Sequence, residues 1–109
     1  MRISVLSDLA VTDQTRAYAE YRVFTGLAAL SRLVQEVEVH LDSRNGEEVD
    51  VDCVVCVEIT SGKRARVRAR GRHAYDAINR AADRMSHRLW ELANAEGSRS
   101  PSARAATSF

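Results

Sequence analysis

Arginine residues are the side chains whose spacing in this sequence most clearly indicates chemistry. Four arginines alternate along residues 64–70, and a second row recurs at helical spacing along residues 80–88, together with one histidine. A guanidinium group carries a permanent charge and several N–H donors, and it pairs well with phosphate oxygens. The two rows therefore favour binding of a polyanion. They comprise Arg64, Arg66, Arg68 and Arg70, and Arg80, Arg84, His87 and Arg88.

The net charge of +1 conceals a division between the two halves of the chain. Residues 1–60 contain five arginines against eleven acidic residues, whereas residues 61–109 contain eleven lysines and arginines against four acidic residues. This asymmetry indicates a polyanion-binding surface on the C-terminal half. Two simpler interpretations are that the helix row only faces water, with Asp76 pairing with Arg80, and that the strand row pairs with acidic residues across a sheet. The acidic candidates are Asp50, Asp52 and Glu58, with Glu36 and Glu38 if their strand lies nearby.

Other reactive residue types form no recognisable constellation. Cys53 and Cys56 form a C-x-x-C pair, but they fall in an alternating segment, where positions three apart point to opposite faces of a strand. We therefore expect neither a redox nor a metal site there. His40 is expected on the outer face of the sheet and His73 at the start of a helix, without a nucleophile beside them. Residues 61–63 resemble a hairpin tip. The sequence thus predicts no catalytic residue, metal ligand, cofactor or small-molecule substrate.

Periodicity predicts the element order β-α-β-β-β-α. Clean alternation of apolar and polar residues indicates an antiparallel sheet with one buried and one solvated face, and two amphipathic helices must cover the buried face. The predicted fold class is therefore an α+β two-layer sandwich, with both helices on one face of a four-stranded sheet. The strands are expected at about 2–7, 34–42, 49–60 and 64–71, and the helices at about 13–33 and 74–95.

Several local signals refine this prediction. Thr12 is a plausible N-cap of the first helix, Gly26 allows an early end of that helix, and Gly97 is expected to end the second. The dipeptide at 45–46 predicts a turn. Trp90 is expected to be half-buried at the edge of the core, with base stacking as the alternative. The first-helix core stripe is expected to comprise Ala17, Tyr21, Phe24, Ala28 and Ser31, widened by Tyr18, Val23, Leu27 and Leu30. The second-helix stripe is expected to comprise Tyr75, Ile78, Ala82, Met85, Leu89 and Leu92.

A length of 109 residues with 45% hydrophobic residues fits one globular domain. We expect this domain at residues 1–96, followed by a disordered Ser/Ala/Arg-rich tail at 97–109. No stretch approaches the ~20 apolar residues of a membrane span, and the N-terminus lacks the pattern of a signal peptide. Two cysteines without a secretion signal also disfavour a disulfide scaffold. The expected location is the cytoplasm, and the oligomeric state is open.

Motifs in both predicted helices resemble one known family. Gly71-Arg72-His73, Tyr75-Asp76-Ala77-Ile78-Asn79 and Asp83-Arg84-Met85 are similar to the family's G-K-H followed by Y-x-A-I-(D/N)-x-x-x-(D/N)-K-L. Thr12, Arg16, Tyr18 and Arg22 are similar to its T-x-x-x-R-x-Y-x-x-x-K pattern. With these pieces in order, residues 1–95 resemble the ribosome hibernation-promoting factors, a family that includes the ribosome-associated inhibitor proteins.

The resemblance implies a function. Family members bind the small ribosomal subunit in the channel used by tRNA and mRNA, and they silence translation under stress or in stationary phase. The implied partner is the small subunit, contacted through the rRNA backbone. Arg16, Arg22, Arg72 and Arg84 match basic positions of the family, and the others are residues of the two basic rows together with Lys63. The candidate RNA-binding residues are Arg16, Arg22, Lys63, Arg64, Arg66, Arg72, Arg80, Arg84, His87 and Arg88.

A second hypothesis is a divergent protein-interaction or dimerising module of the same fold, with weak or no ribosome affinity. It is favoured by the loss of basic residues that the family carries near Thr25-Gly26 and at Glu91. A small enzyme or ligand sensor is a third hypothesis, for which the sequence offers no site. Salt-sensitive RNA binding would distinguish the first hypothesis from the other two.

Overall fold

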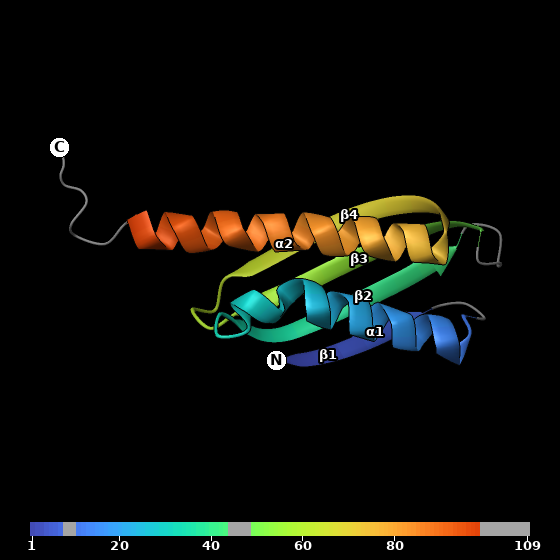
Figure 1. Cartoon of the computed structure of the whole chain (residues 1–109), viewed down its shortest axis with the longest axis horizontal. Coiled ribbons are helices and arrows are strands. Elements are labelled where there is room, and N and C mark those ends of the chain that lie inside the picture. Colours follow the sequence, from blue (N-terminus) through green and yellow to red (C-terminus); the bar gives the residue numbers. More distant parts are fainter. Residues whose placement is uncertain (8–10, 44–48, 99–109) are drawn as a thin grey trace.

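A computed structural model describes residues 1–7, 11–43 and 49–98 of the chain (Figure 1). The predicted element order and the α+β sandwich are confirmed. The expected turn at 45–46 lies outside the described residues. The elements are β1 (Arg2–Ser7), α1 (Asp13–Leu27), the short 3-10 helix η1 (Ala28–Leu30), β2 (Val34–Ser43), β3 (Val49–Ile59), β4 (Arg64–His73) and α2 (Ala74–Ser98).

The four strands form one sheet in the order β1-β2-β3-β4. Strands β2, β3 and β4 pair antiparallel as expected, whereas β1 pairs parallel to β2. The reason is the intervening helix, because a crossover returns the chain to the end of the sheet from which it started. The sheet is therefore mixed, and both β1 and β4 are edge strands. The β3–β4 hairpin turns at Gly62, whose φ of +91° is readily adopted by glycine.

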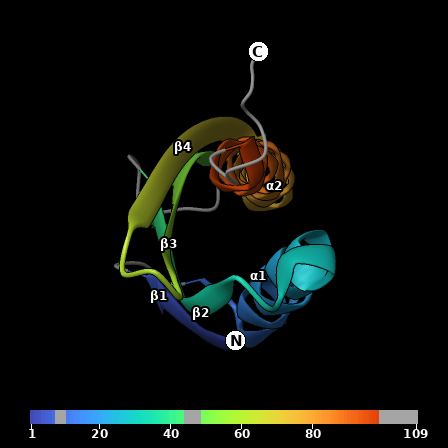
Figure 2. The same ribbon diagram turned by 90° about the vertical axis from the view of Figure 1, so that its left-hand side faces the viewer.

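The sheet curves around both helices, which cover the same face (Figure 2). Helix α2 packs on β4 and β3, while α1 packs on β1 and β2 and against α2. The predicted strand parity is confirmed, since alternate residues of β2 and β3 point into the core and the intervening polar residues point away. The buried strand residues include Val37, Val39, Leu41, Val51, Cys53, Val55, Val57 and Ile59.

Helix α1 begins as predicted and ends earlier than predicted. The Thr12 hydroxyl accepts a hydrogen bond from the Thr15 backbone N–H at 3.1 Å, which satisfies one of the free donors of the first turn. The helix stops at Leu27 and does not reach Leu33. A single 3-10 turn follows, and the Leu33 carbonyl accepts a bond from the Thr60 N–H, which ties this segment to the end of β3. The chain thus turns into β2 without a full further helical turn.

The core stripe predicted for α1 is confirmed at Val23, Leu27 and Leu30 and is wrong at its central positions. Ala19, Val23 and Leu27 are buried, together with Thr15, whereas the side chains that were expected to dominate the core are exposed. Ala17, Ala28 and Ser31 are also exposed. Helix α1 carries apolar residues on two faces, and periodicity alone cannot choose between them. The exposed fractions are 65% for Tyr21 and 51% for Phe24.

Helix α2 follows its predicted stripe more closely. Ile78, Ala82, Met85 and Leu89 are buried and Leu92 is partly buried, but Tyr75, which stacks on Tyr18, is 40% exposed. Trp90, which was expected to be half-buried, is exposed at 48%. The predicted stop at Gly97 is wrong, because the helix continues to Ser98. The rest of the expected tail, residues 99–109, lies outside the described residues.

Gly71 allows β4 and α2 to approach closely. A Cβ atom at this position would lie 2.4 Å from the Ala77 backbone nitrogen and 2.8 Å from the Asp76 Cβ. Real Cβ atoms do not approach backbone atoms this closely, so any larger residue must displace the first turns of α2. The first turns of α2 can therefore rest directly on the end of β4.

We predict that Gly71→Ala lowers the free energy of unfolding by about 2–3 kcal/mol, because the added methyl group overpacks this contact. Gly26→Ala is the matched control. Its Cβ would meet mainly the flexible end of Arg22, at 3.0 Å, and alanine favours a helix by roughly 1 kcal/mol. Urea denaturation of both variants checks the prediction, and equal stabilities would contradict it.

Candidate nucleic-acid interface

On the outer face of the sheet, acidic and basic side chains lie on different strands. Acidic residues project from β2 and β3, and the arginine row projects from β4. The register places Arg2, Glu36, Glu58 and Arg64 in one row across all four strands. In that row Arg2 pairs with Glu36 at 3.3 Å, and Arg64 with Glu58 at 3.8 Å. These pairs are largely exposed, so they orient charges more than they stabilise the fold.

Asp52 neutralises the last two arginines of the β4 row. Its two carboxylate oxygens accept hydrogen bonds from Arg68 and Arg70, each at 2.9 Å. The Asp52 side chain is only 12% exposed. The hydrogen bonds from Arg70 and Arg68 hold the pKa of its carboxyl below the usual range, despite the opposing effect of burial. The predicted cross-strand pairing is thus confirmed for this part of the row.

The other residues that were expected to form ion pairs across the sheet do not form them. Arg66 has no ion pair with any residue that the structure describes, so its guanidinium group is available to a ligand. Asp50 likewise pairs with no described residue, contrary to expectation, and its backbone is turned into the left-handed region at φ +55°. Glu38 pairs with His40 at 3.2 Å and not with the arginine row.

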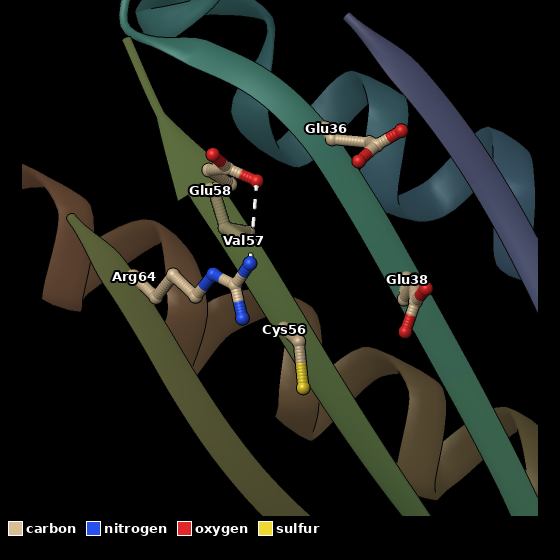
Figure 3. Close-up of a pocket in the computed structure, with 6 residues that line it drawn as sticks. All are labelled: Glu36, Glu38, Cys56, Val57, Glu58 and Arg64. Carbon is tan, nitrogen blue, oxygen red and sulfur yellow. Dashed lines mark ion pairs between the residues drawn. The ribbon is translucent and has the colours of Figure 1, made fainter. Parts of the chain in front are cut away.

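A hollow on the outer face of the sheet is acidic. Figure 3 shows it between β2, β3 and β4, with Glu36, Glu38 and Glu58 around it and Arg64 turned toward Glu58. Cys56 also lines it, while Cys53 is buried on the opposite face, as the strand geometry predicted. Burial raises the pKa of Cys53 to about 12, so that thiol stays protonated at neutral pH. A phosphate would be repelled from this hollow.

Helix α2 brings its own arginines to the free edge of β4. Arg84 Nη1 donates to the Arg68 carbonyl at 2.5 Å, and Arg80 Nη1 donates to the Arg70 carbonyl at 3.3 Å. Arg80 therefore does not form the predicted pair with Asp76. The two bonds also satisfy backbone carbonyls of β4 that have no partner strand, because β4 is an edge strand. Each guanidinium has five N–H donors, so most remain for a ligand.

The arginines of β4 and those on the flank of α2 that contacts the β4 backbone lie beside one another, and we name this group the β4–α2 ridge. Arg88 lies one turn beyond Arg84 on the same flank of α2, and its acidic neighbour is Glu91, at 3.8 Å. His87 also lies near Glu91, at 3.7 Å. The described acidic partners along the ridge are therefore Asp52 and Glu91. The ridge comprises Arg66, Arg68 and Arg70 of β4 and Arg80, Arg84 and Arg88 of α2.

The remaining predicted residues lie on either side of this ridge. Lys63 and Arg64 are exposed at the β3–β4 hairpin, at one end of the ridge, and Arg72 is exposed at the other. Arg16 lies on the far side of the molecule, where it donates to the Val5 carbonyl of β1 at 3.5 Å. The structure therefore brings the residues of β4 and α2 together but not Arg16.

Arg22 joins the two helices. Its Nη2 lies 2.6 Å from the Asp83 carboxylate, and its Nε donates to the Asn79 side-chain oxygen at 3.1 Å. The same oxygen accepts from the Tyr18 hydroxyl at 2.6 Å. The Tyr18 ring stacks on Tyr75 with centroids 4.3 Å apart. Sequence analysis missed this cluster, although its residues recur at helical spacing in both motifs that carried the family resemblance.

Two further observations concern other kinds of site. Among the described residues, no group of three or more His, Cys, Asp or Glu side chains is arranged to hold a metal ion. No helix in the described part of the chain is long and apolar enough to cross a lipid bilayer.

Comparison with known proteins identifies the family. Residues 5–94 match the model described as Sigma 54 modulation protein / S30EA ribosomal protein, which covers all elements apart from the ends of β1 and α2. The chain belongs to this family. The resemblance indicated by the helix motifs is thereby confirmed. The family consists of non-enzymatic ribosome-binding regulators of translation, consistent with the prediction that the chain is not an enzyme.

Solved structures share the fold. The N-terminal domain of Protein Y from Thermus thermophilus is 26% identical and matches with a TM-score of 0.66, covering 84% of this chain and 99% of that one. A ribosomal subunit interface protein from Coxiella burnetii matches with a TM-score of 0.74 at 9% identity, covering 86% of this chain and 99% of that one. At that identity the second match shows the fold alone. No curated protein matches the chain's sequence.

Because the pKa of Asp52 is lowered in the folded state, we predict that its bonds to Arg68 and Arg70 stabilise the fold in a pH-dependent way. The contribution is fully present above the unfolded pKa of about 3.9 and is lost as the pH falls through the folded pKa. Asp52→Asn is expected to lower the free energy of unfolding by about 1–3 kcal/mol at pH 7. The difference from the parent chain should be smaller at an acidic pH that lies below the folded pKa of Asp52, where both side chains are neutral.

Urea unfolding of both proteins at the two pH values measures this difference. Glu58→Gln is the matched control, because Glu58 pairs with an exposed arginine at 3.8 Å and an exposed pair of this kind contributes less than about 1 kcal/mol. A difference for Asp52→Asn that stayed the same at both pH values would rule out the titration of Asp52 as its cause.

Proposed function

We propose that this protein binds the small ribosomal subunit through the rRNA backbone, occupies the channel used by tRNA and mRNA, and silences translation under stress or in stationary phase. The observation that carries the proposal is the β4–α2 ridge, found on a member of a family of ribosome-binding regulators. It follows that the protein acts in the cytoplasm and that residues 1–96 suffice for binding.

The ridge suits phosphate recognition for two reasons. Arginines neutralise phosphates and release counterions, which supplies sequence-independent affinity. In addition, the β4 carbonyls hold Arg80 and Arg84 in place, so less side-chain freedom is lost when a phosphate binds. A rigid array of such contacts fixes orientation on a structured RNA without reading its sequence.

The acidic hollow supports the same orientation. Glu36, Glu38 and Glu58 would repel an RNA placed over the middle of the sheet. An RNA backbone is therefore expected along β4 and α2, with β1 and α1 turned away. Arg16 and Arg22, which the family resemblance also implicates, would contribute little, because the first lies on the far side and the second is held by Asp83 and Asn79.

A second candidate is a module of the same fold with weak or no ribosome affinity. It is favoured by the neutralisation of Arg68 and Arg70 by Asp52, and by Glu91 beside Arg88. Each engaged arginine reduces the number of phosphates that the ridge can neutralise, and affinity falls steeply with that number.

Co-sedimentation with small ribosomal subunits at low and moderate salt tests the proposal. We expect stoichiometric binding that weakens as salt rises. The Arg84→Glu/Arg88→Glu variant should abolish it by placing two negative charges on the ridge. The matched control is Arg2→Glu/Arg32→Glu, which changes the net charge equally at exposed positions off the ridge and should leave binding largely unchanged.

Circular dichroism of both double variants establishes that they fold. Loss of binding in both variants alike would indicate that net charge matters and the ridge does not. Absence of binding by the parent chain at low salt would contradict the proposed function and favour the second candidate.

A further inference from the structure

The basic character of the β4–α2 ridge depends on where the acidic residues of α2 point. Helix α2 contains three arginines and four acidic residues, so its residues alone give no excess of positive charge. Asp83 is the acidic residue at the centre of the arginine row, since it lies three residues after Arg80 and directly before Arg84. Side chains three or four residues apart on a helix are neighbours, so Asp83 has two potential cationic partners within α2, Arg80 and His87.

Asp83 instead forms an ion pair with the neighbouring helix. Helices α1 and α2 lie side by side on the sheet (Figure 2), and Arg22 of α1 places its Nη2 atom 2.6 Å from the Asp83 Oδ1 atom. The Arg22 Nε atom also donates to the Asn79 side-chain oxygen at 3.1 Å. With 25% of its side chain exposed, Arg22 is more buried than any other described arginine that forms an ion pair. The two contacts therefore fix the guanidinium group and turn the Asp83 carboxylate toward α1, away from β4.

This arrangement leaves the arginines beside Asp83 available. Arg80 and Arg84 form no ion pair with any described residue, and each donates a hydrogen bond to a β4 carbonyl. A released Asp83 would pair with Arg80, which has a permanent charge and lies within reach. His87 is the weaker competitor, because it already lies 3.7 Å from Glu91. An Arg80–Asp83 pair would occupy N–H donors that bind phosphate, so the ridge would neutralise one phosphate fewer.

We propose that Arg22 is a positioning residue of the ridge, which holds Asp83 toward α1 and thereby keeps Arg80 free to bind phosphate. Arg22 itself makes no contact with the RNA, because its Nε and Nη2 donors are already used within the protein. The inference rests on the proposed function, since it concerns the strength with which the ridge binds the rRNA backbone. It gives this basic residue of α1 an indirect role, in place of the direct contact that the family resemblance implies.

Equilibrium binding to purified small ribosomal subunits at low salt tests the proposal. Arg22→Ala should bind about threefold to tenfold more weakly than the matched control Arg2→Ala, because a released Asp83 neutralises one arginine of the ridge. Arg2→Ala removes the same charge and also releases a carboxylate, that of Glu36, but on the outer face of the sheet and away from the ridge. Equal affinities of the two variants would overturn the proposal.

Asp83→Asn distinguishes positioning from direct contact. With a neutral side chain at position 83, Arg22 has no acid to hold. Adding Arg22→Ala should then weaken binding no more than Arg2→Ala does in the same background. A further loss of about threefold to tenfold in this background would mean that Arg22 contacts the RNA itself, which would contradict the proposal.

Asn79→Ala is the control for the packing of the helices. Asn79 accepts hydrogen bonds from both Arg22 and Tyr18, so its loss loosens the contact between α1 and α2 without releasing Asp83. This variant should unfold at a lower temperature than the parent chain, yet bind small subunits with the parent affinity. Binding as weak as that of Arg22→Ala would assign the effect to packing and would also count against the proposal.

Arginine side-chain NMR spectra of the free protein follow the same ion pairs without RNA. The Nε–H signal of Arg80 should shift in Arg22→Ala and return toward its parental position when Asp83→Asn is added. An Arg80 signal that Arg22→Ala leaves unchanged would overturn the proposal. The expected shifts in a chain that binds no small subunits would contradict the proposed function and still support the placement of Asp83 by Arg22.

Discussion

The contact between strand β4 and helix α2 determines where the positive charge of this chain collects. Gly71 lets the first turns of α2 rest directly on the strand, so the helix runs back along the free edge of the sheet. From this position Arg80 and Arg84 reach the backbone carbonyls of Arg70 and Arg68. Two arginine rows that are separate in sequence thereby become one surface. The same bonds satisfy β4 carbonyls that could otherwise pair with a strand of another chain.

Acidic residues elsewhere in the fold limit where this surface is positively charged. Asp52 reduces the charge at the last two arginines of the β4 row, while Arg66 remains without an ionic partner among the described residues. The glutamates of β2 and β3 make the middle of the sheet unfavourable for phosphate. At the far edge, α1 exposes Tyr21 and Phe24 together with charged residues such as Arg16 and Glu20. The two edges of the sheet therefore differ, because arginines gather at the β4 edge and two aromatic side chains are exposed near the β1 edge.

The layers of the fold could be predicted from the sequence alone. The buried face of α1 could not, because the same helical periodicity fits either of two apolar faces. Alternation in β2 and β3 placed Val37, Val55 and their neighbours correctly, because a strand has only two faces. On α1, the predicted stripe included Tyr21 and Phe24 and left out Ala19, and only the packing against β1, β2 and α2 shows which face is buried. The basic residues of the ridge were identified individually. Their convergence was not predictable, because bonds from arginines to backbone carbonyls leave no pattern in sequence. Arg22 was named as a candidate RNA contact because it matches a basic position of the family motif, and no local signal in the sequence revealed its bond to Asp83, 61 residues away.

The most direct test of this account is a structure of the protein bound to the small ribosomal subunit, determined by cryo-electron microscopy. The account predicts that rRNA phosphate oxygens lie within hydrogen-bond distance of Arg66, Arg84 and Arg88, with Tyr21 and Phe24 facing away from the RNA. A complex in which the RNA lies against α1 and β1, with the β4–α2 ridge exposed to solvent, would contradict it.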